Sequence, residues 1–294
     1  MKFLKPGQNT YDFVDREFLD ITNIEEVARY VEEKDIKIII NCAAYTNVDA
    51  CEGEGANRAF HVNAFGPMKL GEVMAKRGGM VIHISTDYVY TPYNGWKGEP
   101  FEVWKMDSET DKEKRPMNMY GLTKYLGETA LIESGCEYVI IRTSWLYSTY
   151  GKNFFNTMIE KLAKENTLNV VNDQIGTPTW APGLAAFIID EICQKYEKLT
   201  PSQKHSIVNY SDEGACSWYD FAKEIQSLTG GLRPFEPTVH PCATNMYPRP
   251  AVRPRYSVMD HGILRHLFPD VKLDWWKDNL KKCVNDYYNE QRKH

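Results

Sequence analysis

The residues that could do chemistry lie in two short stretches on either side of a long polar loop. The first is a hydrophobic run that ends in Thr86 and Asp87, and the second is Tyr120-Gly-Leu-Thr-Lys124. Tyr120 and Lys124 are four residues apart, so on a helix they share one face. A tyrosine beside an ammonium group suits proton transfer, because the cation favours the phenolate and lowers the pKa of the phenol.

Spacing alone does not single out this pair. Three other tyrosine–lysine pairs show it, and for them we favour a tyrosine half in the core beside a solvated lysine: Tyr30/Lys34, Tyr93/Lys97 and Tyr219/Lys223. Tyr120 differs because an apolar strand ending at Thr86 precedes it and a second apolar strand, Tyr138 to Ile141, follows its helix. Ligands gather at the carboxyl ends of parallel strands, so Thr86 and Tyr120 are expected to converge there.

The first half of the chain alternates strand and helix patterns. The candidate strands are Tyr11 to Val14, Ile36 to Ala44 and Met80 to Ser85, and the candidate helices are Ile24 to Lys34, Ala56 to Arg77 and Tyr120 to Ser134. The run from Ile36 is almost continuously apolar, which is typical of a parallel strand buried on both faces. We therefore expect an α/β fold, a Rossmann-like doubly wound parallel sheet, over residues 1–147 as a dinucleotide-binding domain.

The second half, residues 148–294, is less regular and is expected to form a smaller α/β substrate-binding region, with segments that can re-cross into the first domain. Its candidate helices are Asn153 to Glu165, Pro182 to Tyr196, Trp218 to Leu228 and Trp275 to Tyr288, and its candidate strands are Leu168 to Asn172 and His205 to Asn209. The loop from Tyr90 to Pro116 is long enough to predict a mobile flap beside the active site, the alternative being a tolerated surface insertion.

Composition excludes several classes of protein. The 294 residues are 43% hydrophobic and 26% charged, with a net charge of -5 and no basic run, which disfavours binding to nucleic acid or an anionic membrane. No apolar segment approaches the roughly 20 residues of a membrane span, and we expect a cytoplasmic protein. The seven cysteines never form a Cys-x-x-Cys pair, so no metal site or disulfide scaffold is expected.

Eight short motifs carry a resemblance to a known family. In chain order they are Leu19-Asp-Ile-Thr-Asn23, Asn41-Cys-Ala-Ala-Tyr-Thr-Asn-Val-Asp49, His83-Ile-Ser-Thr-Asp-Tyr-Val89, Tyr120-Gly-Leu-Thr-Lys124, Arg142-Thr-Ser-Trp-Leu-Tyr147, Asp173-Gln-Ile-Gly-Thr-Pro-Thr179, Cys216-Ser-Trp-Tyr-Asp-Phe-Ala222 and Arg253-Pro-Arg-Tyr-Ser257. Together they resemble the extended short-chain dehydrogenase/reductases, and within them the reductases of dTDP-4-dehydro-L-rhamnose. That resemblance implies reduction of the sugar's 4-keto group with NADPH or NADH, giving dTDP-L-rhamnose for cell-surface polysaccharide.

The resemblance also implies catalytic roles. Tyr120 matches the general acid that protonates the sugar oxygen, and Lys124 matches the residue that lowers the pKa of that phenol and holds the nicotinamide ribose. Thr86 would hydrogen-bond the oxygen where charge develops, and Asp87 would hold the substrate beside it. Without the family, Thr86 and Asp87 would read as an ordinary turn at a strand end.

Binding roles follow in the same way. Ala44, Tyr45 and Thr46 match cofactor contacts at the end of the second strand, Asp15 matches the acid that accepts from the adenosine ribose, and Asp20 and Ile21 match contacts near the adenine. Trp145 matches an aromatic contact to the sugar, with ordinary core packing as the alternative. The remaining substrate contacts are expected at Gln174, Thr177 and Thr179, for the nucleotide half, and at Arg253, whose guanidinium suits the diphosphate.

The chain departs from the family at its start. The glycine turn Gly-x-x-Gly-x-x-Gly, which places a pyrophosphate on a helix N-terminus, does not occur in these residues. Gly66-Pro-Met-Lys-Leu-Gly71 has glycine spacing but lies inside a helical pattern and does not replace it. We expect either a truncated start or a remodelled stretch from Met1 to Thr10 in which dinucleotide binding is weak or lost.

Two other functions stay open. One is an epimerase or dehydratase of the same superfamily, which would need further acid/base residues near Thr86. The other is a non-catalytic binding subunit, since the regulatory subunit of methionine adenosyltransferase is built on the same scaffold; retention of Thr86, Tyr120 and Lys124 argues against it. Fold alone cannot decide between these functions. A homodimer is also open.

Overall fold

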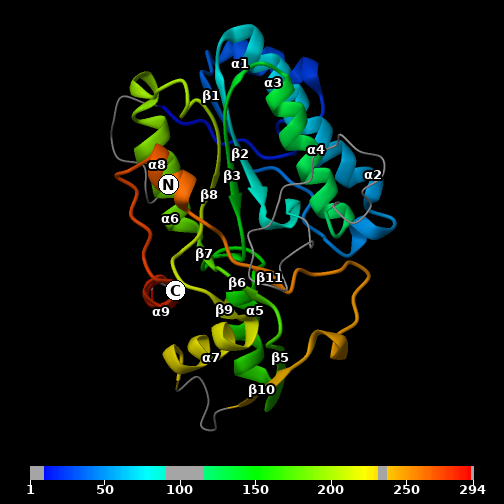
Figure 1. The fold of residues 1–294 in the computed structure, drawn as a ribbon, viewed down its shortest axis with the longest axis vertical. Helices are drawn as coiled ribbons and strands as arrows, with labels where there is room; N and C mark the ends of the chain where they lie inside the picture. Colours follow the sequence, from blue (N-terminus) through cyan, green and yellow to red (C-terminus); the bar gives the residue numbers. More distant parts are fainter. Residues whose placement is uncertain (1–9, 91–115, 231–236, 293–294) are drawn as a thin grey trace.

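Figure 1 shows the computed structural model, which describes residues 10–90, 116–230 and 237–292. A lobe built on a parallel sheet lies above a second lobe of helices and short strands. The predicted flap lies almost wholly outside the described residues, and so does the stretch before Thr10 for which remodelling was considered.

The main sheet has four parallel strands in the order β1-β2-β3-β8. They are β1 (Ile38–Asn41), β2 (Met80–Thr86), β3 (Glu137–Thr143) and β8 (His205–Asn209). In the register of the two central strands Thr86 pairs with Thr143, so both strands end at the same level. The predicted parallel α/β sheet is confirmed.

Helices cover both faces of this sheet (Figure 1). On one face lie α1 (Ile24–Glu33), α3 (Gly66–Arg77) and α4 (Met119–Glu133), and on the other lie α6 (Ala181–Ala186), the π-helical turn η5 (Phe187–Cys193) and α8 (Gly262–Leu267). Side chains alternate along each strand, so Val81 packs toward α3 while Ile82 packs toward η5. This is the doubly wound arrangement that the sequence predicts.

Local signals set the helix ends. Asn23 caps α1 by accepting a hydrogen bond from the Glu26 amide, and Gly78 ends α3 at a left-handed φ of 65°. The helix expected from Ala56 to Arg77 is present as three successive segments, which are α2 (Ala56–Ala59), the π-helical η2 (Phe60–Phe65) and α3. The Gly66 to Gly71 stretch lies in α3, as predicted.

Two predictions about the start of the sheet are wrong. Residues 11–14 form no strand, and Phe13 there is 66% exposed. Within the described residues β1 has a strand neighbour on one side only, so Ile38, Ile39 and Ile40 are half-buried instead of buried on both faces. A strand that is paired on one side only leaves part of its backbone and side chains uncovered, and among the described residues β1 is such an edge strand.

The second lobe has its own apolar core. It contains α5 (Phe154–Lys164), α7 (Trp218–Leu228) and α9 (Trp276–Gln291), packed around Phe155, Phe221 and Leu280. Short parallel pairs join β4 (Leu146–Tyr147) to β7 (Thr179–Trp180) and β5 (Thr167–Val171) to β10 (Thr238–Cys242), and a small sheet has the order β11 (Tyr256–Ser257), β6 (Ile175–Gly176), β9 (Cys216–Ser217). Because β8 belongs to the main sheet, the chain returns to the first lobe after entering the second. The domain boundary at residue 147 stays a prediction.

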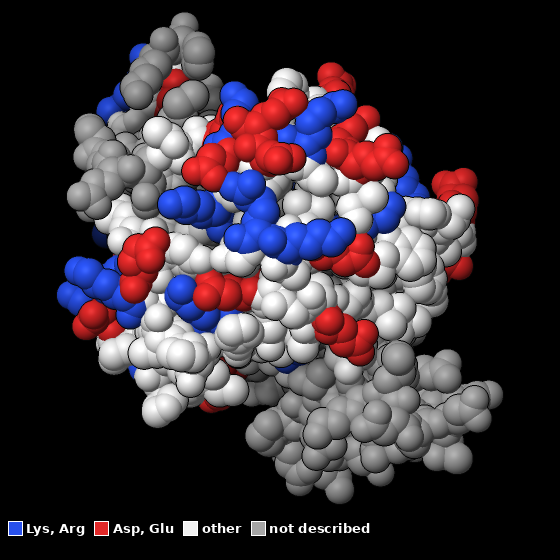
Figure 2. Space-filling view, turned by 90° about the horizontal axis from the view of Figure 1, so that it is seen from above, with Lys and Arg blue, Asp and Glu red and all other residues white. Residues whose placement is uncertain are grey.

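The one-turn 3-10 segments are η1 (Ala50–Glu52), η3 (Asp87–Val89), η6 (Tyr196–Lys198) and η7 (Thr244–Met246). Within the described ranges, no helix is both long and apolar enough to span a bilayer. On the face seen in Figure 2, Lys and Arg form a narrow band bordered by Asp and Glu, without a broad area of one sign.

Candidate active site

Thr86 and Tyr120 meet where β2 ends and α4 begins. Thr86 Oγ1 accepts from the Tyr88 amide at 3.2 Å and so opens η3, while Asn118 caps α4 by accepting from the Gly121 amide at 2.8 Å. Gly121 lies against the backbone of Tyr88, and a Cβ there would collide with the Tyr88 carbonyl. This close approach brings the Tyr120 phenol to the Thr86 hydroxyl, with which it hydrogen-bonds. The predicted convergence is confirmed.

The pKa of Tyr120 is raised, and the sequence predicts the opposite. Burial is the main cause, the hydrogen bond from Thr86 opposes it, and the negative charge of Asp87 adds to it. Lys124 has no part in this balance because its amine points elsewhere. The prediction that Lys124 lowers the pKa of Tyr120 is therefore wrong for this conformation, in which the raised pKa keeps the phenol protonated.

Lys124 is buried and turned toward the sheet. Its Nζ donates to the Ile84 carbonyl at 2.6 Å and lies 3.3 Å from His83 Nε2, whose other ring nitrogen is 3.0 Å from Asn41 Nδ2. Burial lowers the pKa of Lys124 to about 8, against the opposing charge of Glu128. A lysine with this pKa can change its protonation state near neutral pH.

Asp87 has a buried oxygen without a partner. One carboxylate oxygen accepts from Thr86 Oγ1 at 3.0 Å, and the carboxyl also accepts from Ser257. Among the described residues, Oδ2 of Asp87 is the buried side-chain polar atom for which no hydrogen bond is found. Burial raises the pKa of this carboxyl to about 6. A buried, unsatisfied acceptor costs free energy, so this atom is suited to accept a hydroxyl from a ligand.

A buried ion pair between α4 and β3 stabilises the elements that carry Thr86 and Tyr120. Arg142 on β3 donates to Glu128 on α4 through Nε at 3.0 Å and Nη2 at 2.6 Å, and Ser85 also donates to this carboxylate. The pair ties the catalytic helix to the two strands that end at Thr86 and Thr143. Sequence reasoning missed Glu128 and His83, although Glu128 follows Lys124 by one helical turn and His83 opens its motif.

The predicted cofactor contacts around β1 lie close to Lys124. Asn63 accepts from the Tyr45 amide at 2.7 Å and donates to the Tyr45 carbonyl at 3.0 Å and to Thr123 at 3.1 Å, which holds the segment after β1 against α4. Cys42 and Thr46 are exposed and Ala44 is half-buried, and the charge of Lys124 acts on the Cys42 thiol. Small, partly exposed residues thus lie beside a buried amine, and their contact with a nicotinamide cofactor stays a prediction.

Asp15, Asp20 and Ile21 have structural partners in this conformation. Asp15 is exposed and accepts from the Phe18 amide at 3.0 Å. Asp20 accepts from the amide and hydroxyl of Thr22, which lowers its pKa and forms the turn into α1. Ile21 packs against Gly66. Their roles at the adenosine end stay predictions.

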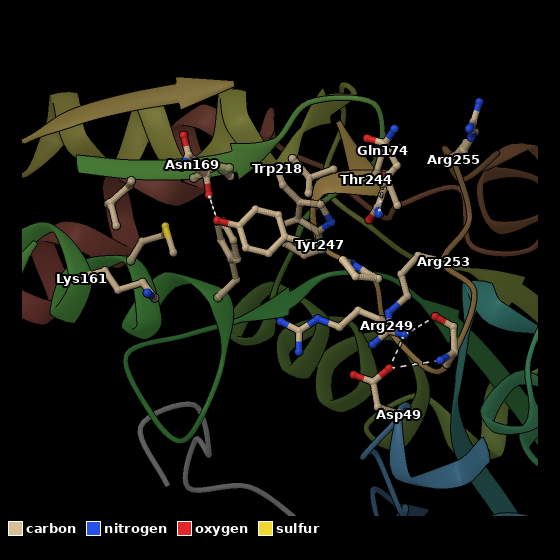
Figure 3. A pocket seen from close by; sticks show the side chains of 18 of the residues that line it. Asp49, Lys161, Asn169, Gln174, Trp218, Thr244, Tyr247, Arg249, Arg253 and Arg255 are labelled. Carbon is tan, nitrogen blue, oxygen red and sulfur yellow. Dashed lines mark hydrogen bonds and ion pairs between the residues drawn. The ribbon is translucent and has the colours of Figure 1, made fainter. Parts of the chain in front are cut away.

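A cavity of about 1030 Å³ lies between the second lobe and the proline-punctuated connector formed by residues 241–254 (Figure 3). Four cationic side chains line it: Lys161, Arg249, Arg253 and Arg255. Gln174 lines it as well, with its amide donating to Thr244 at 3.0 Å. The structure thus places the predicted residues Gln174 and Arg253 in one cavity, where four cations suit an anionic ligand.

Asp49 links this cavity to the catalytic tyrosine. Arg253 Nη1 donates to Asp49 at 2.7 Å and to the Ala251 carbonyl at 2.6 Å. The hydrogen bond from Arg253 to Asp49 holds the pKa of the Asp49 carboxyl below its usual value. The charges of Arg253 and Asp49 both influence the pKa of Tyr88. The Tyr88 ring packs edge-on against the Tyr120 ring, with centroids 5.6 Å apart. Tyr88 therefore packs against Tyr120 and is close enough to the Asp49–Arg253 pair to be influenced by its charges.

Thr177 and Thr179 are directed into the protein and away from this cavity. Both are buried and neither lines the cavity. Thr179 Oγ1 accepts from Thr143 at 2.9 Å, and Thr177 Oγ1 lies 3.1 Å from Ser144 Oγ. Their hydroxyls join the end of β3 and Ser144 to the start of β7 and the residues before it, and their contact with a nucleotide stays a prediction.

Comparison with known proteins agrees with this geometry. The family described as RmlD substrate binding domain matches residues 2–289. A dTDP-4-dehydrorhamnose reductase of Burkholderia thailandensis is 32% identical over 280 residues, covering 94% of this chain and 90% of that protein. The chain belongs to the dTDP-4-dehydrorhamnose reductase family.

Solved structures of the family superpose over most of the chain. A dTDP-4-dehydrorhamnose reductase from Clostridium acetobutylicum is 36% identical with a TM-score of 0.78, covering 94% of this chain and 89% of that one. The Bacillus anthracis reductase, solved in complex with NADP, is 32% identical with a TM-score of 0.81, covering 97% of this chain and 93% of that one. The similarity therefore includes both lobes.

Proposed function

We propose that this protein reduces the 4-keto group of dTDP-4-dehydro-L-rhamnose to dTDP-L-rhamnose with NADPH or NADH, in a route to cell-surface polysaccharide. Membership of the reductase family supports this reaction. The observation that carries it is the cluster of Thr86, Asp87 and Tyr120, in which a protonated phenol, a hydroxyl and an unsatisfied carboxylate oxygen lie together.

Each group has one task in the reaction. A bound NADPH or NADH supplies the hydride. Tyr120 donates its phenolic proton to the sugar oxygen as negative charge develops there, and the Thr86 hydroxyl stabilises that charge. Because burial raises the pKa of Tyr120, the phenol is protonated before the reaction, which is the form that an acid requires. Asp87 Oδ2 accepts a hydroxyl of the sugar and fixes its orientation.

The residues present fit the nicotinamide half of the cofactor. Ala44, Tyr45 and Thr46 would line it, and Lys124 would leave the Ile84 carbonyl to reach the ribose hydroxyls. Placed there, the ammonium would also approach Tyr120 and lower the pKa of the phenol. In this proposal the family's expected tuning by Lys124 therefore belongs to the cofactor-bound state.

The cationic cavity would take the nucleotide diphosphate. Arg253 offers the guanidinium N–H groups that Asp49 does not engage, and Gln174 offers amide groups to the nucleotide. Arg249, Arg255 and Lys161 add positive charge around the same space. We also propose that the protein is a homodimer and is located in the cytoplasm. The reaction described above depends on neither property.

Steady-state turnover tests the proposal. The wild-type protein is expected to oxidise NADPH or NADH only when dTDP-4-dehydro-L-rhamnose is present. Tyr120→Phe is expected to lower turnover by roughly 100-fold or more, the usual contribution of a general acid, while dTDP affinity stays unchanged. Equal turnover of the two proteins would refute the assignment of the acid, and cofactor oxidation without the sugar would refute the reaction.

A further inference from the structure

Trp145 holds a backbone conformation that side chains rarely adopt. Its φ is +47°, and among the described residues other than glycine only Asp35, in an exposed turn, also has a positive φ. A bulky residue in this region is strained, and such strain persists where the surroundings over-determine it. Trp145 lies two residues beyond Thr143, the residue that pairs with Thr86. The strain therefore sits at the level of the catalytic strand ends.

Two neighbours fix the Trp145 ring. A Cβ at Gly176 would lie 2.7 Å from the indole, so the ring rests on a position that only glycine leaves open. Trp218 stacks on the indole with ring centroids 3.5 Å apart and an interplanar angle of 10°. The Trp145 ring is half-buried, so this packing does not enclose it in the core.

Trp218 is itself held firmly. It is the first residue of α7, and Ser217 and Asp220 form a capping box around that helix start. The ring of Phe154 packs 4.5 Å from its own at an angle of 43°. Trp218 and Phe154 line the cationic cavity, whereas Trp145 does not. Trp218 is thus in contact with both the nucleotide cavity and the strained tryptophan.

We infer that Trp218 is a positioning residue for the sugar subsite, because its stacking holds the strained Trp145 side chain where it meets the sugar. The inference rests on the proposed reduction of a dTDP-sugar and on the contact between Trp145 and that sugar that the family resemblance implies. Through this stack, the wall of the nucleotide cavity sets the shape of the sugar subsite. Selectivity for the sugar then depends on Trp218 of α7, which lies in the second lobe, whereas Thr86 and Tyr120 lie in the first.

A double-mutant cycle tests this coupling. Trp218→Ala is expected to lower kcat/KM for the dTDP-sugar by roughly tenfold, the usual scale for a slight misplacement near the reacting groups, with KM for NADPH unchanged. If Trp218 acts through Trp145, Trp218→Ala added to Trp145→Ala has little further effect. Trp218→Phe, which can still stack, is expected to restore most of the activity. Trp275→Phe, on a half-exposed tryptophan elsewhere, is the matched control.

Circular dichroism gives a readout that does not depend on activity. Two stacked indoles produce an exciton couplet, which both Trp218→Ala and Trp145→Ala are expected to abolish and Trp275→Phe to retain. Additive losses of kcat/KM in the double variant, or full activity after loss of the couplet, would overturn the inference alone. Absence of wild-type turnover would overturn the proposed function and this inference with it.

Discussion

Replacing Asp87 by Asn is expected to stabilise the protein and impair it as a catalyst at the same time. The carboxyl is buried, and one of its oxygens, Oδ2, has no hydrogen-bond partner. Asn keeps the shape and the oxygen that accepts from Thr86. It removes the buried charge and replaces the unsatisfied acceptor with a donor.

The size of the stability change follows from the pKa of Asp87. Burial raises it from 3.8 to about 6, so the folded state binds the proton more tightly than the unfolded state. The contribution of this proton to stability is complete below pH 3.8 and is lost as the pH rises through about 6. Two pKa units correspond to about 3 kcal/mol, so at pH 8 the ionised carboxylate destabilises the fold by up to that amount.

Urea unfolding at pH 4 and pH 8, combined with kinetics, measures both effects. Asp87→Asn should be more stable than wild type at pH 8 by up to about 3 kcal/mol, with a much smaller difference at pH 4. Its kcat/KM should fall by roughly 10- to 100-fold, because a hydrogen bond between a charged group and the sugar is lost. Asp270→Asn, on the exposed surface, is the control. A variant that is less stable at pH 8, or that keeps full activity, would refute this reasoning.

Three further substitutions test other parts of the site. Lys124→Met is expected to raise KM for NADPH and lower turnover, and no effect on either would exclude contact with the cofactor. Glu128→Gln leaves Arg142 without its buried partner and should destabilise the fold by about 3 to 5 kcal/mol in urea unfolding; a loss under 1 kcal/mol would contradict a supporting role. Arg253→Leu should weaken dTDP binding by roughly tenfold in calorimetry, whereas unchanged affinity would place the diphosphate elsewhere.

The sequence predicts the catalytic part of the site well because its signals are local. An apolar run ending in Thr86 can only be a buried strand in an alternating pattern, and a tyrosine and lysine one turn apart need only a helix to share a face. The parallel topology then brings the strand end and the helix start together. The family resemblance, and not local spacing, placed Gln174 and Arg253 on one ligand, and both line the cavity.

The features that the sequence did not predict depend on contacts between residues that are far apart in the chain. Burial of the run from Ile38 to Ile40 depends on a neighbouring strand, and hydrophobicity alone cannot show whether that neighbour is there. Thr177 and Thr179 look like any exposed polar residues in sequence, yet their hydroxyls pair inward with Ser144 and Thr143. Residue spacing could not predict these pairings.

The predicted effect of Lys124 on the pKa of Tyr120 was wrong for a similar reason. The helical spacing of Tyr120 and Lys124 suggests a cation beside a phenol, but spacing does not fix where a flexible amine points. In this structure the amine of Lys124 reaches the Ile84 carbonyl, and burial is then the largest influence on the pKa of Tyr120. The stack of Trp145 on Trp218, whose members are 73 positions apart, is another feature that only the fold reveals.

The most direct test of the central claim is isotopic. NADPH carrying deuterium at its transferable position is incubated with dTDP-4-dehydro-L-rhamnose and the protein, and the product is examined by proton NMR. Reduction of the 4-keto group predicts dTDP-L-rhamnose with deuterium at C4 of the sugar, formed by wild type and formed by Tyr120→Phe at a rate lower by roughly 100-fold or more. A product without deuterium, or with deuterium at another carbon, would contradict the account.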